Sequence, residues 1–248
     1  MEDDKNYSVL LRLEEMIAVI TSCINPKKMA STTRSFFTLE EREFQTINTL
    51  KKLKEVGFKQ IILADNSYEY DFSKLGSATD DVQIIHLKQY QFANKSINEI
   101  LILLSILDYI PADTKIFKIS GRYFPVANFK LDMNDTVDFK VKGFDFDGKK
   151  PVISTRGYFV RNKVVYEEFL LAGLNEIYSY PYRVVGLRSF WRFIAEFFKP
   201  KLKTSSNISV EFAAARVLKR GRFNFQLVDN LNIEGHIAGL KSKELIKE

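Results

Sequence analysis

The chain has 248 residues, 46% of them hydrophobic, and a formal net charge of +6 at pH 7. This length and composition suffice for one substantial core, so we expect a single domain over residues 1–248. One cysteine and two histidines exclude an internal disulfide and a zinc site built from cysteine and histidine. Without a run of ~20 apolar residues or a signal-like start, the chain is expected to be cytoplasmic. The charge favours anionic partners, but scattered lysines and the lack of a recognisable module argue against nucleic acid.

The first part of the chain alternates between strand and helix patterns. Residues 16–20 are apolar, which is typical of a buried strand. Thr38 and Glu41 have the spacing of a capping box, and apolar residues then recur at helical spacing over residues 39–55. Residues 60–64 predict a second strand. This β-α-β unit predicts an α/β fold with a mostly parallel central sheet.

Polar residues follow both strands of this unit. Thr21 and Ser22 end the first strand, and Asp65 and Asn66 end the second. Because the carboxyl ends of parallel strands meet at one edge of a sheet, we expect these side chains to lie together, where Asp65 could accept a ribose hydroxyl or a base edge. An Asp-Asn-Ser sequence is equally typical of any strand that exits into a loop.

The next strand and helix carry a charge that conflicts with the helix dipole. Residues 82–87 alternate like a strand, and residues 95–110 form a strongly apolar helix. Glu99 in its first turn suits the positive end of the dipole, whereas Lys95 does not. We interpret Lys95 as facing a bound anion.

The central strand, residues 115–120, ends in a small cationic tip made of Ser120, Gly121 and Arg122. Gly121 permits a close backbone approach, Arg122 can grip a phosphate through two parallel hydrogen bonds, and Lys118 supplies a second charge. The tip therefore predicts the floor of an anion site beyond the carboxyl end of the sheet. The alternative is that Arg122 pairs with a surface carboxylate and Gly121 only shapes a loop.

The second half of the chain predicts a hairpin, helices and one more strand. Two strands, 135–146 and 151–160, are joined at Asp147-Gly148, so we interpret Asp145-Phe-Asp147 as a turn rather than as a divalent-metal motif. Helices are expected at 164–178 and 207–220 and a strand at 223–228, and the end from Lys241 is expected to be loose.

Residues 183–203 form a basic amphipathic segment. Phe190 and Phe193 lie on one side of the predicted helix, Arg188 and Arg192 on another, and Trp191 flanks the apolar face. Such a segment can lie on an anionic membrane surface. It can equally be a core helix that shows its charged back to solvent.

Several short motifs occur together in this chain. They are Thr21-Ser22, Glu41-Arg42 with Gln45, Asp65-Asn66-Ser67, Lys95-Ser96 with Glu99, Phe117-Lys118-Ile119-Ser120-Gly121-Arg122-Tyr123 and Ser154-Thr155-Arg156. Their combination resembles a group of bacterial and archaeal glycosyltransferases of capsule and O-antigen polysaccharide synthesis. The resemblance spans about residues 16–160, and Glu211 is a further match.

The resemblance implies a single GT-A-like domain with a mostly parallel sheet, a hairpin and C-terminal helices. Residues 16–125 would be the nucleotide-binding half and residues 126–240 the acceptor half. The implied reaction moves a sugar from a sugar-nucleotide or sugar-pyrophosphate donor to a glycan acceptor, which could be lipid-linked. The chain departs from the wider GT-A pattern because a Lys-x-Ser-Gly-Arg-Tyr motif stands where Asp-x-Asp would bind a metal. We therefore expect metal-independent transfer without a cofactor.

The resemblance also implies roles for single residues. Arg122 and Lys118 would neutralise the leaving phosphate, with Lys95 and Arg156 converging on the same crevice. Glu99 and Glu211 are the candidates for the base that deprotonates the acceptor. The expected donor contacts are Thr21, Ser22, Asp65, Asn66, Lys95, Ser120, Gly121 and Arg156.

Two alternatives remain open from the sequence. The cationic tip would serve phosphoribosyl pyrophosphate as well as a nucleotide sugar, which would make the protein a sugar-phosphate transferase. The chain could also be a non-catalytic module that binds a nucleotide or a glycan. Donor binding and donor turnover distinguish these hypotheses.

Overall fold

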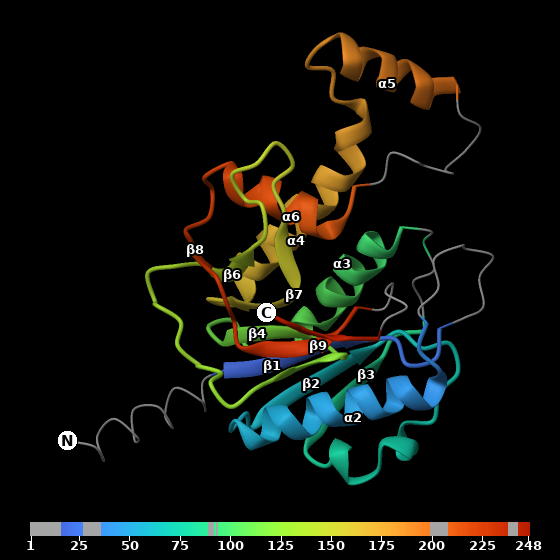
Figure 1. Ribbon diagram of the computed structural model, residues 1–248, viewed down its shortest axis with the longest axis vertical. Coiled ribbons are helices and arrows are strands. Elements are labelled where there is room, and N and C mark those ends of the chain that lie inside the picture. The colour runs from blue at the N-terminus through green and yellow to red at the C-terminus, as the bar shows by residue number, and fades with distance from the viewer. Residues whose placement is uncertain (1–15, 27–35, 89–91, 93, 199–207, 238–242) are drawn as a thin grey trace.

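The computed structural model describes residues 16–26, 36–88, 92, 94–198, 208–237 and 243–248. Helices cover both faces of a seven-stranded sheet, and a separate three-stranded sheet lies beside it (Figure 1). The strands of the large sheet are, in spatial order, β3 (Val82–His86), β2 (Gln60–Asp65), β1 (Met16–Ser22), β4 (Lys115–Ser120), β7 (Ile153–Val160), β6 (Phe139–Gly143) and β8 (Phe225–Val228). This architecture confirms the predicted α/β fold with a mostly parallel central sheet.

The order of the strands creates a switch point between β1 and β4. β1 pairs in parallel with β2 on one side and with β4 on the other, while β7 runs antiparallel to both of its neighbours. The chain leaves β1 toward β2 and β3 and then crosses to β4. In sheets of this kind ligands bind in the crevice beyond the carboxyl ends of the two strands at the reversal.

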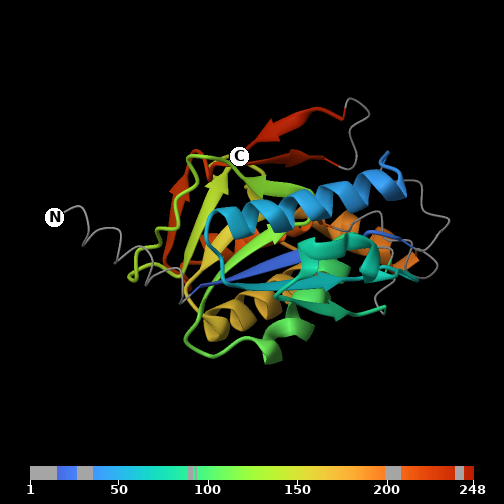
Figure 2. The same ribbon diagram turned by 90° about the horizontal axis from the view of Figure 1, so that it is seen from below.

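The described helices are α2 (Leu39–Glu55), α3 (Lys95–Ile106), α4 (Lys163–Ser179), α5 (Leu187–Phe198) and α6 (Val210–Lys219), with short 3-10 helices η1 (Phe72–Thr79), η2 (Leu107–Tyr109) and η3 (Tyr180–Tyr182). Helices α2, α3, α4 and α6 divide between two faces of the sheet, as Figure 2 shows from below, whereas α5 packs on η3. Apolar residues of α3, α4 and α6 form one core cluster with the sheet, and residues of α2 and η1 form the other. Each helix that follows a parallel strand begins at the carboxyl edge, so α2 and α3 present their N-termini there.

The predicted capping box explains where α2 begins. Thr38 Oγ1 accepts a hydrogen bond from Glu41 N at 3.2 Å, and Glu41 Oε2 accepts one from Thr38 N at 2.8 Å. Asn94 caps α3 in a similar way, since its side chain accepts from Ser96 N at 2.8 Å. Both caps satisfy backbone donors that would otherwise have no partner in the first turn.

The chain end corrects one expectation. Residues 245–247 were expected to be loose, but they form strand β10, which pairs with β9 (Ile233–His236), and β9 pairs with β5 (Tyr123–Pro125). The reason is tertiary pairing with β9, because a strand of three residues is too short to show a recognisable pattern in the sequence. Residues 238–242 lie outside the described part of the chain.

Other predicted elements are confirmed with changed ends. The hairpin is present, but β6 and β7 are shorter than expected and are joined by the longer segment 144–152. The expected helix at 183–203 is α5, and its predicted end beyond Phe198 falls on residues outside the described ranges. No described helix combines the length and apolarity needed to cross a bilayer. The division into a nucleotide-binding and an acceptor half stays a prediction.

Candidate functional site

The carboxyl edge of the sheet brings the predicted strand-end residues into register. Thr21 lies opposite Ser120 in the pairing of β1 with β4, and Ser22 lies opposite Asp65 in the pairing of β1 with β2. The peptide N–H of Gly121 donates to Thr21 O at 2.9 Å, which extends the ladder by one residue. The residues at the end of three strands therefore share one edge, as the sequence predicted.

Gly121 and Gly235 let the backbone pack closely at Arg122. A Cβ on Gly121 would meet Ser22 Cβ at 3.2 Å, and a Cβ on Gly235 would lie 2.4 Å from Arg122 O. On the other side of the tip, the His236 N–H donates to Arg122 O at 3.2 Å. The backbone of Arg122 is thus held between β1 and β9, which fixes where its side chain starts.

Three cationic side chains act on one another at this edge. They are Arg42 in the first turns of α2, Lys95 at the start of α3, and Arg122 after β4. Burial, followed by the charge of Arg42, lowers the pKa of Arg122. Burial, followed by the charges of Arg122 and Arg42, lowers the pKa of Lys95. A lowered pKa means that the protonated, positively charged form is destabilised, and a bound anion would stabilise that form again.

The guanidinium of Arg122 includes a buried donor atom. Its Nε is buried and has no hydrogen-bond partner among the described residues. A buried donor without a partner costs about 1–3 kcal/mol. The N-termini of α2 and α3 add further partial positive charge at the same edge. The predicted anion site therefore gains a physical basis that the sequence motif alone did not have.

Arg42 was not among the residues predicted for the site. Its guanidinium donates to Cys23 O at 2.9 Å through NH1 and to Phe37 O at 3.3 Å through Nε, so it joins the loop after β1 to the start of α2. Its position in the first turns of the helix after the first strand was the signal that could have revealed it.

Lys118 and Glu99 form an ion pair beside the cationic cluster. Lys118 is fully buried, and its Nζ lies 2.5 Å from Glu99 Oε1 and 2.5 Å from Thr155 O. The Glu99 side chain keeps 28% of its surface exposed. Its negative charge raises the pKa of Arg122 against the effects of burial and of Arg42. Glu99 thus contacts Lys118 through one carboxylate oxygen, while part of its side chain stays accessible.

The position of Lys118 corrects its expected role. Its ammonium is buried with two partners. Lys118 points to the opposite face of the sheet from Phe117 and Ile119, and helices cover both faces of this central strand, so side chains on either face are buried. It therefore does not offer an uncompensated charge to a leaving phosphate. Its contact with Glu99 makes it a positioning residue for that carboxylate.

The N-terminus of α6 meets the N-terminus of α3. Val210 N donates to Ser96 Oγ at 2.8 Å, which fixes the two helix ends together. Glu211, the acidic residue in the first turn of α6, is partly buried at this junction. Glu211, the second candidate for the base, therefore lies on α6 close to where this helix contacts the start of α3.

Asp65 lies at the predicted edge but is engaged with the backbone. It is fully buried, its Oδ1 accepts from Ser67 N at 2.7 Å, and its Oδ2 accepts from Ile24 N at 3.2 Å. Both oxygens brace the loops that follow β1 and β2, in the manner of an Asx turn. This corrects the expectation of a carboxylate that faces the donor, while Asn66 beside it is only partly buried.

Arg156 does not join the cationic cluster as an uncompensated charge. Its guanidinium forms an ion pair with Glu248, and Ser154 Oγ hydrogen-bonds to the same carboxylate. It also lies over the ring of Tyr123, 5.7 Å from the centroid, and so stays near the tip of β4. The carboxylate of Glu248 thus balances the charge of Arg156, a contact between distant segments that the sequence did not predict.

No three described histidine, cysteine, aspartate or glutamate residues come together as a metal site. Asp145 and Gly148 occupy the segment between β6 and β7, where Gly148 N donates to Asp145 O at 3.3 Å. That bond agrees with the interpretation of this motif as a turn. Metal independence itself stays a prediction.

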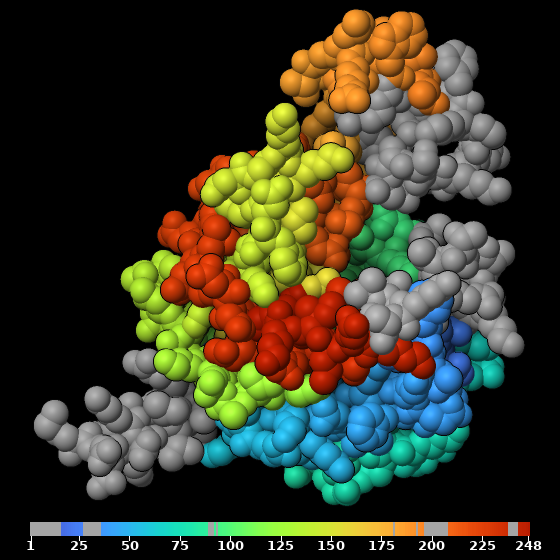
Figure 3. Space-filling model, viewed as in Figure 1, coloured from blue at the N-terminus to red at the C-terminus, as the bar shows by residue number. Residues whose placement is uncertain are grey.

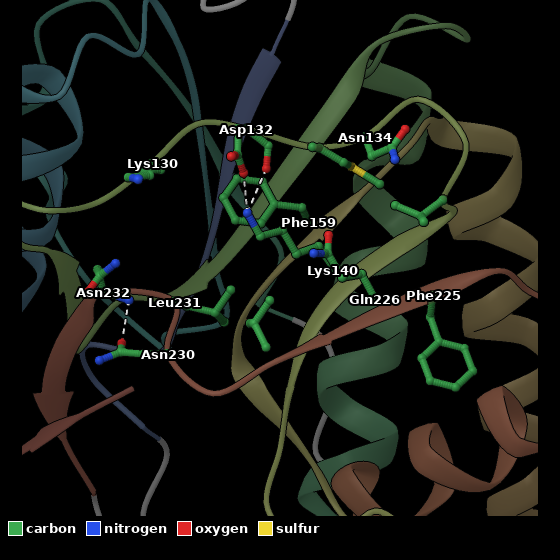
Figure 4. A pocket seen from close by; sticks show the side chains of 13 residues that line it. Lys130, Asp132, Asn134, Lys140, Phe159, Phe225, Gln226, Asn230, Leu231 and Asn232 are labelled. Atoms are coloured by element: carbon green, nitrogen blue, oxygen red, sulfur yellow. Dashed lines mark hydrogen bonds and ion pairs between the residues drawn. The ribbon is translucent and has the colours of Figure 1, made fainter.

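A pocket of about 650 Å³ lies elsewhere, across β6, β7 and β8 (Figure 4). Phe159, one of its lining residues, pairs with Phe117 toward the amino end of β4, away from Arg122. The ammonium of Lys140 in this pocket already pairs with the carboxylate of Asp132. We therefore place the candidate site at the carboxyl edge rather than in this pocket.

The sequence matches no family model and no curated protein. The fold is shared with a CTP:phosphocholine cytidylyltransferase of Streptococcus pneumoniae, at 10% identity and a TM-score of 0.50, over 92% of this chain and 95% of that one. A nucleoside-diphosphate-sugar pyrophosphorylase of Vibrio cholerae has 9% identity and a TM-score of 0.47, over 91% and 97%. A glycosyltransferase of Streptococcus pneumoniae has 10% identity and a TM-score of 0.42, over 86% of this chain and 45% of that one.

Proposed function

We propose that this protein is a glycosyltransferase that moves a sugar from an activated phosphate donor to a glycan acceptor in surface polysaccharide synthesis. The observation that carries the proposal is the cluster of Arg42, Lys95 and Arg122 beside the carboxylate of Glu99, at the switch point of the sheet. A cation cluster next to a partly exposed carboxylate provides both the charge for a leaving phosphate and a base for an acceptor hydroxyl.

In this proposal the donor phosphates bind across Arg122 and Lys95. The bond between the anomeric carbon and the phosphate oxygen breaks, and the electron pair leaves with the phosphate. The guanidinium of Arg122 and the ammonium of Lys95 stabilise the negative charge that develops on the leaving group. Arg42 holds the loop after β1 in place through its bonds to Cys23 O and Phe37 O.

Glu99 receives the proton of the acceptor hydroxyl as that oxygen bonds to the anomeric carbon. Lys118 holds the carboxylate in position, since its Nζ lies 2.5 Å from Glu99 Oε1. A base that acts directly on the acceptor corresponds to an inverting reaction. Glu211 is the second candidate for this role, at the junction of α6 with α3.

The proposal includes the finer predictions about partners. The donor is a nucleotide sugar, with Thr21, Ser22, Asn66, Ser120 and Gly121 as its contacts at the strand ends. The acceptor is a glycan, which could be lipid-linked. Transfer without a metal is part of the proposal because fixed cations supply the charge.

A donor screen by thermal shift tests the proposal. The ligands are nucleotide sugars, phosphoribosyl pyrophosphate and nucleoside triphosphates, each with and without a chelator. The triphosphates belong in the screen because the protein with the same fold is named for CTP. We expect a nucleotide sugar to raise the melting temperature equally in both conditions and to be turned over when an acceptor is present.

The other outcomes assign a different function. A shift with phosphoribosyl pyrophosphate alone would favour the sugar-phosphate transferase, and a shift with a triphosphate alone would favour nucleotidyl transfer. Donor binding without turnover by any acceptor would indicate a binding module. Loss of the shift on chelation would refute metal independence.

A further inference from the structure

The first turn of α5 and the residues before it expose an unusual number of apolar side chains. We define the α5 tip as residues 182–191. Val185 has 91% of its surface exposed, Leu187 has 74% and Trp191 has 62%. Tyr182 and Phe190 are exposed as well. Contiguous apolar exposure of this kind marks an interaction surface rather than an ordinary part of a soluble protein's surface.

The α5 tip stands away from the rest of the molecule. Figure 1 shows α5 at one end of the long axis, with α2 at the other end, and Figure 3 shows the same segment projecting from the main body. Helix α5 is joined to α4 through η3. A planar partner could therefore approach the tip without meeting the sheet or α2.

A group of arginines lies at the base of the tip. Arg183, Arg216 and Arg220 all pair with the carboxylate of Glu176, which is fully buried. The side chains of Arg216 and Arg220 are 33% and 45% exposed, so part of their charge reaches solvent. Arg188 on the tip itself is also exposed. The apolar tip is thus bordered by positive charge.

We propose that the α5 tip docks on an anionic lipid bilayer. An amphipathic helix with aromatic side chains on one face and arginines beside them lies in the headgroup region, where apolar side chains enter the acyl boundary and cations meet the phosphates. Tyr182 and Trp191 are residue types that favour this interface. The Glu176 cluster ties α6 to η3 and so holds the base of the tip rigidly against α4.

This surface is distinct from the candidate site, so its function does not depend on the transfer reaction. The chain's net charge of +6 favours the same surface.

Vesicle flotation tests the proposal with the full chain. The vesicles are made of phosphatidylcholine alone or of equal parts of phosphatidylcholine and phosphatidylglycerol. The tip variant carries Val185→Ser, Leu187→Ser and Trp191→Ser. The matched control carries Tyr109→Ser, Val164→Ser and Leu171→Ser, whose side chains are about half exposed on other elements. Because all six side chains are exposed, both variants should melt like the wild type.

We expect the wild type and the control to float with the anionic vesicles and the tip variant to lose roughly tenfold or more in binding. The variant Arg188→Gln should lose about fivefold on anionic vesicles and nothing on neutral ones. Trp191 is the only tryptophan of the chain, so its emission should move to shorter wavelength when anionic vesicles are added to the wild type.

Several results would overturn the proposal. One is equal flotation of the tip variant and the wild type, and another is binding to neutral vesicles as strong as to anionic ones. Self-association that the tip variant abolishes, without vesicle binding, would assign the tip to a second copy of the chain. A donor-induced thermal shift should be the same in the tip variant and the wild type, which separates this proposal from that of the transferase.

Discussion

Two clusters of basic side chains lie in this molecule, and they differ in what neutralises them. At the base of α5, three arginines converge on the buried carboxylate of Glu176. At the carboxyl edge of the sheet, Arg42, Lys95 and Arg122 repel one another, and the nearby Glu99 is already paired with Lys118. A buried carboxylate joins the three cations of the first cluster, whereas the three cations of the second lower one another's pKa by like charge.

The pKa values are lowered in both clusters, but for opposite reasons. Burial pushes the pKa of Glu176 upward, but hydrogen bonds from Arg216 and Arg183 outweigh it, so the pKa lies below the ordinary value. The pKa values of Lys95 and Arg122 are also lowered, and there the cause is burial followed by like charge. A lowered carboxyl pKa reports stabilisation of a charge, while a lowered amine or guanidinium pKa reports its destabilisation. The comparison therefore distinguishes a cluster whose charges stabilise one another from a cluster whose charges destabilise one another.

The largest expected effect is on transfer. Arg122→Ala should reduce kcat/KM with the donor found by screening by about a thousandfold, because it removes a cation aimed at the developing negative charge. Arg216→Ala, in the cluster that has its own anion, serves as the comparison and should leave kcat/KM within about threefold. Initial rates of product formation measure both. Near-normal rates for Arg122→Ala would remove the centre of the proposed mechanism.

The next effect is on stability at the other cluster. Glu176→Gln should lower the free energy of unfolding by about 2 kcal/mol, since it leaves three partly buried arginines without their carboxylate. Because the folded pKa of Glu176 is below the unfolded value, its contribution is complete above the unfolded pKa and is lost as pH falls through the folded one. Urea denaturation of wild type and variant at several pH values below 6 measures this. An unchanged difference between the two proteins across that range would contradict the assignment.

A smaller effect concerns the pH dependence of anion binding. Inorganic pyrophosphate should raise the melting temperature of the wild type, and the effect should weaken as pH rises through the lowered pKa of Lys95. Lys95→Met should show a smaller shift without this alkaline decline. The ligand titrates equally with both proteins, so the difference between them isolates Lys95. Identical pH profiles would show that Lys95 does not contact the anion.

The smallest expected effect is an increase in stability. Arg122→Met keeps an apolar stem but removes a guanidinium that repels Arg42 and has an unpartnered buried Nε. We expect the ligand-free variant to gain about 1 kcal/mol in unfolding free energy. Urea denaturation without added anions measures it. A loss instead would show that the guanidinium is satisfied without a ligand.

Local pattern was sufficient to predict most of the large sheet. The strand before Thr21, the capping box at Thr38 and the apolar helix after Lys95 each carry their signal within a few residues. The topology then follows, because a β-α-β unit has one favoured hand and puts the strand ends at one edge. The short strands β5, β9 and β10 were missed since their stability comes from pairing across long separations.

The sequence predicted the location of the candidate site but not which of its charged side chains are paired. Sequence order places Arg122 and Lys95 at the carboxyl edge, but it does not show which charges are already paired. Lys118 proved to be bound to Glu99, and Arg156 to Glu248, through contacts between distant segments. Partner choice depends on side-chain direction and burial, which a single sequence does not reveal.

The bond from His236 N to Arg122 O also sets a temporal order for the molecule. During synthesis, β1 to β4 can leave the ribosome long before β9 exists, yet the tip of β4 lacks one of its two backbone anchors until His236 has emerged. Domains of this size complete such long-range pairings late. A nascent chain therefore carries the basic side chains of this edge without their final geometry until the segment around His236 has been synthesised.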